Sequence, residues 1–291
     1  MSSTFAAWVE GLRLRTLPAA IAPIPVGLGA AWTVAPVHWG RAALALVVAL
    51  ALQIGVNFAN DYSDGIRGSD SARQGPARLV ASGAATPAAV RGAAFAAFAV
   101  ACIAGAALSW LSGHPWLMAV GAAAVLAGWC YTGGPRPYGY MGWGEVGVFV
   151  FFGLVAVLGT QYTQLSAATA PAVLGACGIG LLACAILMAN NLRDLAADSK
   201  AGKRTAAVIL GDRRARTVYQ AELLAAFACA GAIAIWNPRA LAALILLPPA
   251  IRLIGPVGRG AKGEDLVAVL RSTGQIELGY GLILGVALAL G

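Results

Sequence analysis

The chain has 291 residues, of which 59% are hydrophobic and only 11% are charged, and its formal net charge is +8. This balance excludes an ordinary water-soluble domain, in which about a quarter of the residues carry charge. The chain is therefore expected to be an integral membrane protein.

Apolar stretches recur along the whole chain at the length that crosses a bilayer as a helix, roughly 17 to 25 residues. Transmembrane barrel strands would alternate apolar and polar residues, whereas Ala, Gly and Leu run on here without that period. The sequence therefore predicts an all-α bundle of about nine transmembrane helices around a central cavity. The predicted spans are 16–36, 42–60, 86–112, 115–131, 143–163, 170–191, 216–236, 238–255 and 272–291.

The positive residues predict the orientation of these spans. All the Lys and Arg residues except Arg41 and Arg239 lie at the N-terminus, or in or beside the loops after the second, fourth, sixth and eighth predicted spans. Short loops rich in Lys and Arg mark the cytoplasmic side. We therefore expect a multi-pass protein of the cell (plasma) membrane whose N-terminus and charged loops are cytoplasmic and cap the cavity.

The N-terminal segment combines apolar and basic residues before the first predicted span. Trp8, Leu12 and Arg13 suit a short helix that lies in the headgroup region. Pro18 and Pro23 then predict a kink in the first span, because proline removes a backbone donor and clashes with the preceding turn.

An acidic cluster, "NDYSD" at residues 60–64, stands at the end of the second predicted span. Asn60 and Asp64 are four residues apart and therefore share one ridge of a helix. The next carboxylate, Asp70, would point about 120° away from Asp64 if the helix continued. Gly65 and Gly68 are expected to let the chain curl back toward the cluster.

The loop after the fourth predicted span reads "YTGGPRPYGYMGWGE", residues 131–145, and carries a single basic residue, Arg136. Its glycine, proline and tyrosine content is typical of a lid over a cavity. It is equally typical of a tight turn with interfacial aromatic side chains. The sequence leaves both interpretations open.

A second acidic cluster follows four spans after the first. Asn190, Asp194 and Asp198 are successive i,i+4 neighbours, and Asn190 with Asp194 repeats the spacing of the first cluster. Matching clusters at corresponding places predict a single transmembrane domain with two related halves, roughly 1–131 and 132–291. The halves are expected to face one another across the cavity.

Carboxylates at a membrane boundary are costly unless they face a polar cavity or bind cations. Asp and Asn oxygens with no His or Cys nearby suit Mg²⁺, which completes its coordination with water and phosphate oxygens. Two such clusters predict a diphosphate bridging two ions; the alternative is a set of solvated loops with weak ion pairs. The basic residues that follow the clusters are Arg67, Arg73 and Arg78, and then Lys200, Lys203 and Arg204.

A diphosphate site with apolar walls suggests a substrate with a charged head and a hydrocarbon tail, as in a polyprenyl diphosphate. In that chemistry metal ions stabilise the leaving diphosphate, and an electron-rich acceptor captures the allylic cation. The chain contains no nucleophile elbow, P-loop or Rossmann fingerprint, which is consistent with metal-assisted ionisation.

The residues resemble the UbiA superfamily of intramembrane aromatic prenyltransferases, whose two motifs read N-D-x-x-D and D-x-x-x-D. "NDYSD" (60–64) and "DLAAD" (194–198) match these motifs in order. The resemblance extends over nearly the whole chain, through "RLRTLPAAIAP", "GPARLVASG" and "GKRTAAVILG". Asp70, in place of an acid at position 68, departs from the general pattern and suits the branch that prenylates 1,4-dihydroxy-2-naphthoate.

The resemblance implies an enzyme of menaquinone biosynthesis. It would transfer a polyprenyl group from polyprenyl diphosphate to 1,4-dihydroxy-2-naphthoate with loss of carboxylate, giving demethylmenaquinone, with Mg²⁺ as cofactor. Its partners would be these substrates and membrane lipid, without nucleic acid or an obligatory protein partner. The implied residues are Asn60, Asp64, Asn190, Asp194 and Asp198 for metal, Tyr131, Asp61 and Asp70 for catalysis, Arg15, Arg67, Arg78, Arg136 and Lys203 for the diphosphate, and Arg193 for the acceptor.

Three alternatives remain open on the sequence alone. The acceptor is 4-hydroxybenzoate or another aromatic compound instead of the naphthoate. The chain is a transporter, for which paired halves and intramembrane charges are also expected. The acidic clusters belong to a membrane assembly protein and only organise its loops.

Overall fold

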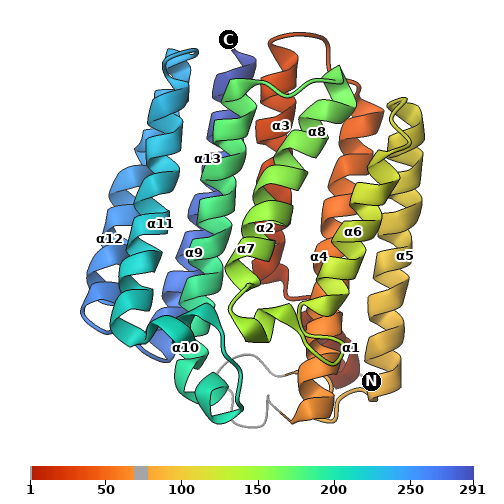
Figure 1. Cartoon of the computed structure of the whole chain (residues 1–291), viewed down its shortest axis with the longest axis vertical. Helices are drawn as coiled ribbons and strands as arrows, with labels where there is room; N and C mark the ends of the chain where they lie inside the picture. Colours follow the sequence, from red (N-terminus) through yellow and green to blue (C-terminus); the bar gives the residue numbers. More distant parts are fainter. Residues whose placement is uncertain (1, 69–77) are drawn as a thin grey trace.

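The computed structural model describes residues 2–68 and 78–291, which form helices joined by short connections. The long helices stand side by side as near-parallel rods along the longest axis of the molecule (Figure 1). The elements of the first part are α1 (Ser2–Gly11), η1 (Leu14–Thr16), α2 (Leu17–Ile21), α3 (Pro23–Trp32), α4 (Trp39–Arg67), α5 (Pro87–Leu111) and α6 (Leu117–Cys130). Those of the second part are η2 (Tyr138–Met141), α7 (Gly144–Val148), η3 (Phe149–Val155), α8 (Ala156–Leu165), α9 (Ala170–Lys200), α10 (Ala206–Leu210), α11 (Asp212–Ile233), η4 (Pro238–Leu246), α12 (Leu247–Gly258) and α13 (Glu264–Ala289).

Six helical segments in the described part of the chain are long and apolar enough to cross a membrane. They coincide with six of the predicted spans, and the other three predicted spans fall on α6, α11 and α13. Helix α6 has only 14 residues, which is short for a ~30 Å hydrocarbon core. The six segments are Phe5–Trp32, Trp39–Arg67, Pro87–Leu111, Gly144–Leu165, Ala170–Lys200 and Pro238–Gly258.

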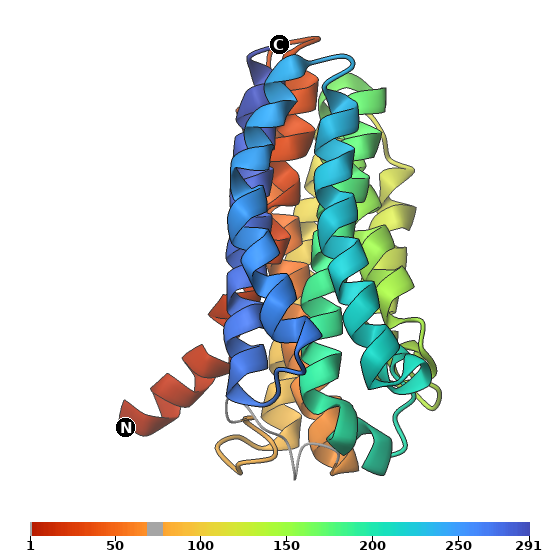
Figure 2. The same ribbon diagram turned by 90° about the vertical axis from the view of Figure 1, so that its left-hand side faces the viewer.

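The N-terminal helix α1 leaves the bundle at an angle near its lower end (Figure 2). The chain then turns at Arg13, which adopts the left-handed conformation with φ 52°. Helix α3 begins directly at Pro23, so the predicted kink in the first span falls at the junction of α2 and α3. The C-terminus lies at the opposite end of the bundle from the N-terminus (Figures 1 and 2).

Local sequence signals set the ends of the long helices. Thr86 and Thr169 cap the N-termini of α5 and α9, where each hydroxyl accepts from a backbone N–H three residues on. Helix α4 ends at Gly68, whose φ of 68° is accessible to glycine without a side-chain clash. As a result α4 continues past residue 60, and the first acidic cluster is helical.

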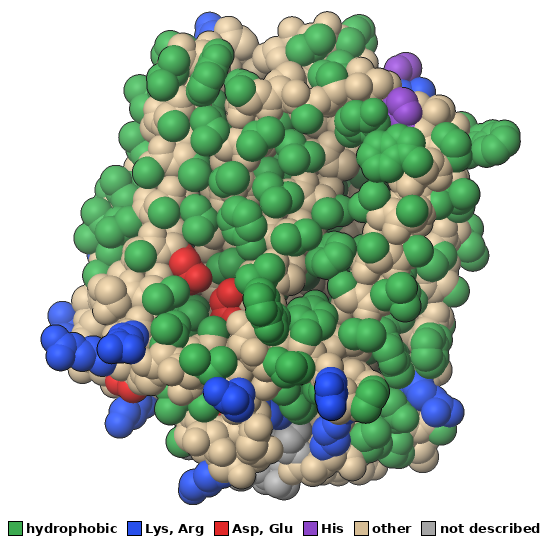
Figure 3. Space-filling model, viewed as in Figure 1, with side chains coloured by type: hydrophobic (Ala, Val, Ile, Leu, Met, Phe, Trp, Pro, Cys, Tyr) green, Lys and Arg blue, Asp and Glu red, His purple; other side chains and the backbone are tan. Residues whose placement is uncertain are grey.

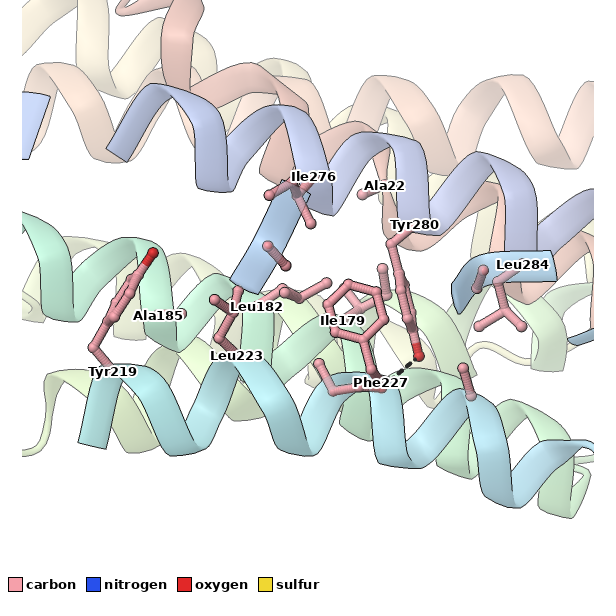
Figure 4. Close-up of a cluster of buried hydrophobic side chains, with 14 of the residues drawn as sticks. Ala22, Ile179, Leu182, Ala185, Tyr219, Leu223, Phe227, Ile276, Tyr280 and Leu284 are labelled. Atoms are coloured by element: carbon pink, nitrogen blue, oxygen red, sulfur yellow. Dashed lines mark hydrogen bonds between the residues drawn. The ribbon is translucent and has the colours of Figure 1, made fainter. Parts of the chain in front are cut away.

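The largest hydrophobic core lies where α9, α11 and α13 pack together (Figure 4). Leu182 of α9, Leu223 of α11 and Leu284 of α13 are all fully buried in it. The polar end of the buried Tyr280 side chain has a partner, because its hydroxyl donates a hydrogen bond to the carbonyl oxygen of Ala226 at 2.8 Å. This solid packing places the central space of the molecule on the other side of α9, between α9 and α4.

Helices α3 and α13 approach one another through glycines. A Cβ atom on Gly29 would lie 2.0 Å from the carbonyl oxygen of Gly285, and one on Gly281 would lie 2.3 Å from that of Ala22. Small residues allow this close backbone contact, as the glycine-rich composition predicts. The contact ties the beginning of the chain to its end.

The surface combines a broad hydrophobic belt with charge concentrated near one end. On the face in Figure 3, Lys and Arg side chains gather at the lower end, where α10 and the 131–141 loop lie. The histidines lie near the upper end of the same face. This distribution agrees with the asymmetry of the loops in the sequence.

Candidate functional site

A cavity of about 1160 Å³ lies inside the bundle and is lined by residues of both predicted halves. Apolar side chains of α4, α6, α8 and α9 make most of its wall. Polar side chains gather where α4 and α9 approach the charged end of the molecule. The predicted site residues that line it are Arg15, Asn60, Asp61, Asp64, Arg78, Tyr131, Asn190, Arg193, Asp194, Asp198 and Lys203.

The first acidic cluster occupies the last turns of α4, where Asp64 is only 5% exposed. Asp61 is also buried, and its carboxylate accepts hydrogen bonds from the backbone N–H groups of Leu79 and Val80 at 2.9 and 3.0 Å. Asp61 therefore fixes the chain segment that carries Arg78, which supports the site from the side.

The loop at residues 131–141 lies over the first cluster. The Thr132 hydroxyl donates to the Asn60 side-chain oxygen at 2.7 Å, and the Tyr140 hydroxyl donates to an oxygen of Asp64. Arg67, at the end of α4, donates to the carbonyl oxygens of Thr132 and Gly134. These contacts hold the loop against the cavity, which favours the lid over the simple turn.

The second acidic cluster comes from the last turns of α9. Arg193 binds the neighbouring Asp194 through two nitrogens, at 2.8 and 2.5 Å, and also donates to the Asn190 side-chain oxygen at 2.8 Å. The cation thus orders two of the predicted ligands in one arrangement, as expected of a planar guanidinium beside a carboxylate.

Lys203 joins the two clusters. Its ammonium lies 3.1 Å from Oδ1 of Asp64 and 3.9 Å from Oδ1 of Asp198, and 4.6 Å from the centre of the Tyr140 ring. Burial lowers the pKa of Lys203. The Asp64 carboxylate, Tyr140 and Asp198 raise this pKa by more than burial lowers it, so the pKa of Lys203 lies above its usual value. Lys203 is therefore a permanent positive charge between carboxylates of α4 and α9.

The donor chemistry of these clusters suits Mg²⁺. The candidate ligands are carboxylate and amide oxygens that all line one cavity, and the Lys203 ammonium already places a cation between two of the carboxylates. No group of three or more His, Cys, Asp or Glu side chains is assembled as a metal centre within residues 2–68 and 78–291. The carboxylate and amide oxygens are therefore the type of ligand that Mg²⁺ prefers. In this structure Lys203 and Arg193 contact the carboxylates.

The basic residues predicted to bind the diphosphate divide into two groups. Arg15, Arg78 and Lys203 line the cavity, and Arg78 and Lys203 are only 8% exposed. Arg67 makes its contacts with the loop carbonyls, and Arg136 is exposed on the outside of that loop. Asp70 lies outside the described residues.

Tyr131 reaches the cavity from the end of α6. Its ring packs edge-on against Tyr138, with the ring centres 5.4 Å apart. The N–H of Gly139 donates to the Tyr131 carbonyl at 3.0 Å, which fixes the backbone at the start of the loop. The electron-rich face of a tyrosine in this position is suited to a positive charge inside the cavity.

Several polar residues of the cavity were missed in the sequence. Gln53 and Asn57 line the same wall as Asn60 and Asp64, and Thr16 of η1 contacts both. Their signal was the helical spacing 53, 57, 60 and 64 within an otherwise apolar span. Tyr140 could not be identified from the sequence, because a loop has no helical periodicity from which to predict which side chains face the cavity.

Residues 20–257 match the UbiA prenyltransferase family. The chain is 51% identical to 1,4-dihydroxy-2-naphthoate octaprenyltransferase of Mycobacterium tuberculosis, with 99% of both chains covered. It is 39% identical to the Escherichia coli protein described in the same words, over 77% of this chain and 74% of the relative.

The fold is similar to solved structures from archaea. A UbiA homolog from Archaeoglobus fulgidus bound to DMAPP and Mg²⁺ gives a TM-score of 0.68 at 16% identity, covering 96% of this chain and 99% of that one. A UbiA homolog from Aeropyrum pernix K1 gives a TM-score of 0.68 at 16% identity, with 93% and 97% covered. The chain therefore belongs to the UbiA prenyltransferase family and is a membrane-embedded prenyltransferase, which favours the enzyme over the transporter and the assembly protein.

Proposed function

We propose that this member of the UbiA family transfers a polyprenyl group from polyprenyl diphosphate to 1,4-dihydroxy-2-naphthoate, in the pathway to menaquinone. The observation that carries the proposal is the meeting of both acidic clusters in one apolar-walled cavity, where Lys203 joins Asp64 to Asp198. The acceptor follows from the Mycobacterium tuberculosis relative, whose name specifies it and which matches along its whole length.

The residues that would hold Mg²⁺ are those whose oxygens line the charged end of the cavity. Bound Mg²⁺ supplies positive charge that stabilises the departing diphosphate. Asp61 and, in the segment outside the described residues, Asp70 support the first set. The proposed ligands are Asn60, Asp64, Asn190, Asp194 and Asp198.

Cationic side chains complete the neutralisation of the diphosphate. Arg15, Arg78 and Lys203 already line the cavity. Arg67, at the end of α4, contacts the 131–141 loop, and Arg136 belongs to that loop, so both would act on the head group from the side of the loop. The bond between the allylic carbon and the diphosphate oxygen breaks, and its electron pair leaves with the diphosphate. The apolar wall holds the hydrocarbon chain and excludes water from the resulting cation.

The acceptor ring then supplies the new bond. Its carbon forms a bond to the allylic carbon, and the carboxylate on that ring carbon departs as CO₂ and returns an electron pair to the ring. The product is the hydroquinone form of demethylmenaquinone. Tyr131, which lines the cavity, would stabilise the cation through its ring, and Arg193 would bind the acceptor carboxylate.

The proposal includes an orientation in the cell membrane. Nine spans, formed with α6, α11 and α13 in addition to the six strongly apolar segments, would place the termini on opposite sides. The end that carries the lid and most Lys and Arg residues would face the cytoplasm, as the positive-inside rule predicts. Polyprenyl diphosphate would then present its head group on the cytoplasmic side.

The experiment is turnover by the purified protein in detergent. Radiolabelled polyprenyl diphosphate is supplied with 1,4-dihydroxy-2-naphthoate or with 4-hydroxybenzoate in separate reactions, with Mg²⁺ and with or without a chelator. Prenylated product from the naphthoate alone, lost with chelator, is the expected result. Product from 4-hydroxybenzoate alone would keep the reaction class and overturn the acceptor.

A further inference from the structure

A continuous polar stripe runs down the cavity face of α4. It consists of Gln53, Asn57, Asn60 and Asp64, which follow one another at helical spacing and all line the cavity. The lower pair belongs to the first acidic cluster. Gln53 lies seven residues before Asn60, which is about 10 Å along the helix at 1.5 Å per residue. The upper pair is therefore deeper in the membrane than the proposed diphosphate site.

A hydrogen-bond network holds the upper pair in one orientation. The Gln53 amide nitrogen donates to the Thr16 hydroxyl at 2.9 Å and to the Asn57 side-chain oxygen at 3.2 Å. The Asn57 amide nitrogen donates to the Leu12 carbonyl at 3.0 Å and to Thr16 at 3.0 Å. The Thr16 hydroxyl in turn donates to the Arg13 carbonyl at 2.9 Å.

This network fixes which end of the Gln53 amide is the oxygen. The atom that faces the Asn57 side-chain oxygen must be a donor, so it is the NH₂ group, and the Asn57 amide is fixed in the same way by the Leu12 carbonyl. Both amide hydrogens of Gln53 are used within the protein. Its Oε1 is buried without a partner, on a side chain that is only 7% exposed and lines the cavity.

A buried acceptor oxygen without a partner is destabilising, because it has lost its hydrogen bond to water and gained none in return. The missing group is a hydrogen-bond donor, which excludes a carboxylate, a diphosphate or the hydrocarbon chain as the ligand of this atom. Arg13, whose carbonyl accepts from Thr16 in the same network, carries a buried, unpartnered Nη2 donor and also lines the cavity. An unpartnered acceptor and an unpartnered cationic donor on the wall of one cavity suit an anionic molecule that bears a hydroxyl.

We propose that Gln53 is the specificity residue for the aromatic acceptor: its Oε1 accepts a hydrogen bond from a ring hydroxyl. The inference rests on the proposed function, because it assigns the hydroxyl to the acceptor of that reaction. The ring is held between the amide and the diphosphate end of α4, where the allylic carbon is released. A hydrogen bond from the hydroxyl to the amide also increases the electron density of the ring that forms the new bond.

The test compares acceptors that differ only in their hydroxyl groups. The two monohydroxy-2-naphthoates, each of which lacks one ring hydroxyl, are measured as competitive inhibitors against 1,4-dihydroxy-2-naphthoate, with the wild type and with Gln53→Met. Methionine keeps the length of the side chain and removes the acceptor. The matched control is Gln275→Met, the same substitution at an exposed position of α13 that does not line the cavity.

In the wild type, one of the two inhibitors is expected to bind about tenfold more weakly than the other, the effect of one lost hydrogen bond to a buried partner. In Gln53→Met this difference disappears, and the KM for 1,4-dihydroxy-2-naphthoate rises about tenfold while the KM for polyprenyl diphosphate is unchanged. Gln275→Met behaves as the wild type. If Gln53→Met does not fold, Gln53→Asn, which retains the amide and withdraws its oxygen, is expected to reduce the same difference.

Equal binding of both inhibitors by the wild type would overturn the inference, because it would mean that the Gln53 oxygen is occupied by water. So would a Gln53→Met enzyme that keeps the difference, or one in which the KM for polyprenyl diphosphate rises instead. These outcomes require a wild type that prenylates 1,4-dihydroxy-2-naphthoate. Absence of that product from the wild type would contradict the proposed function itself.

Discussion

At the scale of single residues, the site is a set of oxygens already occupied by the protein's own cations. Lys203 stands between Asp64 and Asp198, and Arg193 chelates Asp194. If a metal diphosphate binds here as proposed, it would exchange these partners, and the Lys203 ammonium would turn from carboxylate to phosphate. The exchange would be favourable because the carboxylates would gain a divalent ion and the ammonium would retain an anionic partner.

Replacing Lys203 by methionine tests this role. Lys203 is buried, with its ammonium 3.1 Å from Asp64. If this ammonium binds the head group as proposed, the variant loses one charge-assisted contact, and the KM for polyprenyl diphosphate is expected to rise about tenfold to hundredfold. Steady-state kinetics with varied diphosphate measures it, and Lys200→Met, at an exposed position three residues earlier, is the control. An unchanged KM in Lys203→Met would exclude the lysine from diphosphate binding.

The Asp61 carboxylate anchors the segment that contains Leu79 and Val80, and the effect of removing this anchor can be measured separately from activity. In Asp61→Asn one of the two backbone N–H groups of Leu79 and Val80 faces an NH₂ group instead of an oxygen. We expect a loss of about 1 to 3 kcal/mol in the free energy of opening this segment, seen as faster hydrogen exchange at residues 79–83. Exchange as slow as in the wild type would show that the carboxylate does not anchor the segment. The exposed Glu264→Gln serves as control.

The sequence predicted which polar residues share one face of each helix, because helical spacing places Asn60 beside Asp64, and Asn190 beside Asp194 and Asp198. It did not predict that Lys203 contacts Asp64, since the two residues are 139 positions apart and meet only through packing of α9 against the first half. Gln53 was overlooked because a single amide in an apolar span is a weak signal beside a cluster of carboxylates.

At the scale of elements, the loop at residues 131–141 lies over the first acidic cluster, and we propose that it acts as a lid. Arg67 holds this loop against α4. It donates to the carbonyls of Thr132 and Gly134, and its guanidinium lies 5.5 Å from the centre of the Tyr140 ring. The composition of this loop predicted either a lid or a turn, since glycine and proline report backbone shape and not the residues that a loop covers.

Arg67→Leu is expected to release the loop. Two carbonyl contacts and the ring contact disappear together, so amide exchange at residues 132–141 should accelerate and turnover should fall at saturating substrate. Hydrogen-exchange mass spectrometry reports the first effect. Arg136 is an exposed residue of the loop itself, and Arg136→Leu should leave amide exchange unchanged. Equal acceleration in both variants would show that Arg67 does not hold the loop in place.

The close contact of α3 and α13 depends on glycine at its crossing point. Gly29→Ala places a Cβ atom 2.0 Å from the Gly285 carbonyl oxygen, so the helices must separate, at a cost of about 1 to 3 kcal/mol or more. A lower midpoint in detergent thermal unfolding is expected. Gly92→Ala on α5, where a Cβ atom meets no heavy atom within 4 Å, should leave the midpoint unchanged or raise it.

At the scale of the whole molecule, the two acidic clusters gain their function from the bundle between them. Six of the predicted spans are found in the structure because hydropathy and length determine them. The central cavity was also expected, whereas the residues of its apolar wall could not be predicted, since they depend on which of many similar Ala- and Gly-rich faces pack together. Helix α9, which packs on its other side against α11 and α13, forms one wall of the cavity, and α4 with α6 forms another. Whether the two halves are structurally related stays a prediction from the repeated motifs.

The most direct test of the account is the Mg²⁺-dependent prenylation of 1,4-dihydroxy-2-naphthoate by Asp64→Ala and Asp194→Ala, one variant from each cluster. Glu264→Ala, an exposed acid outside the cavity, is the control for the loss of a carboxylate. We predict that both cluster variants insert into the membrane normally and form no product at any Mg²⁺ concentration, while the control retains full activity. Wild-type turnover in either cluster variant would contradict a site shared between α4 and α9.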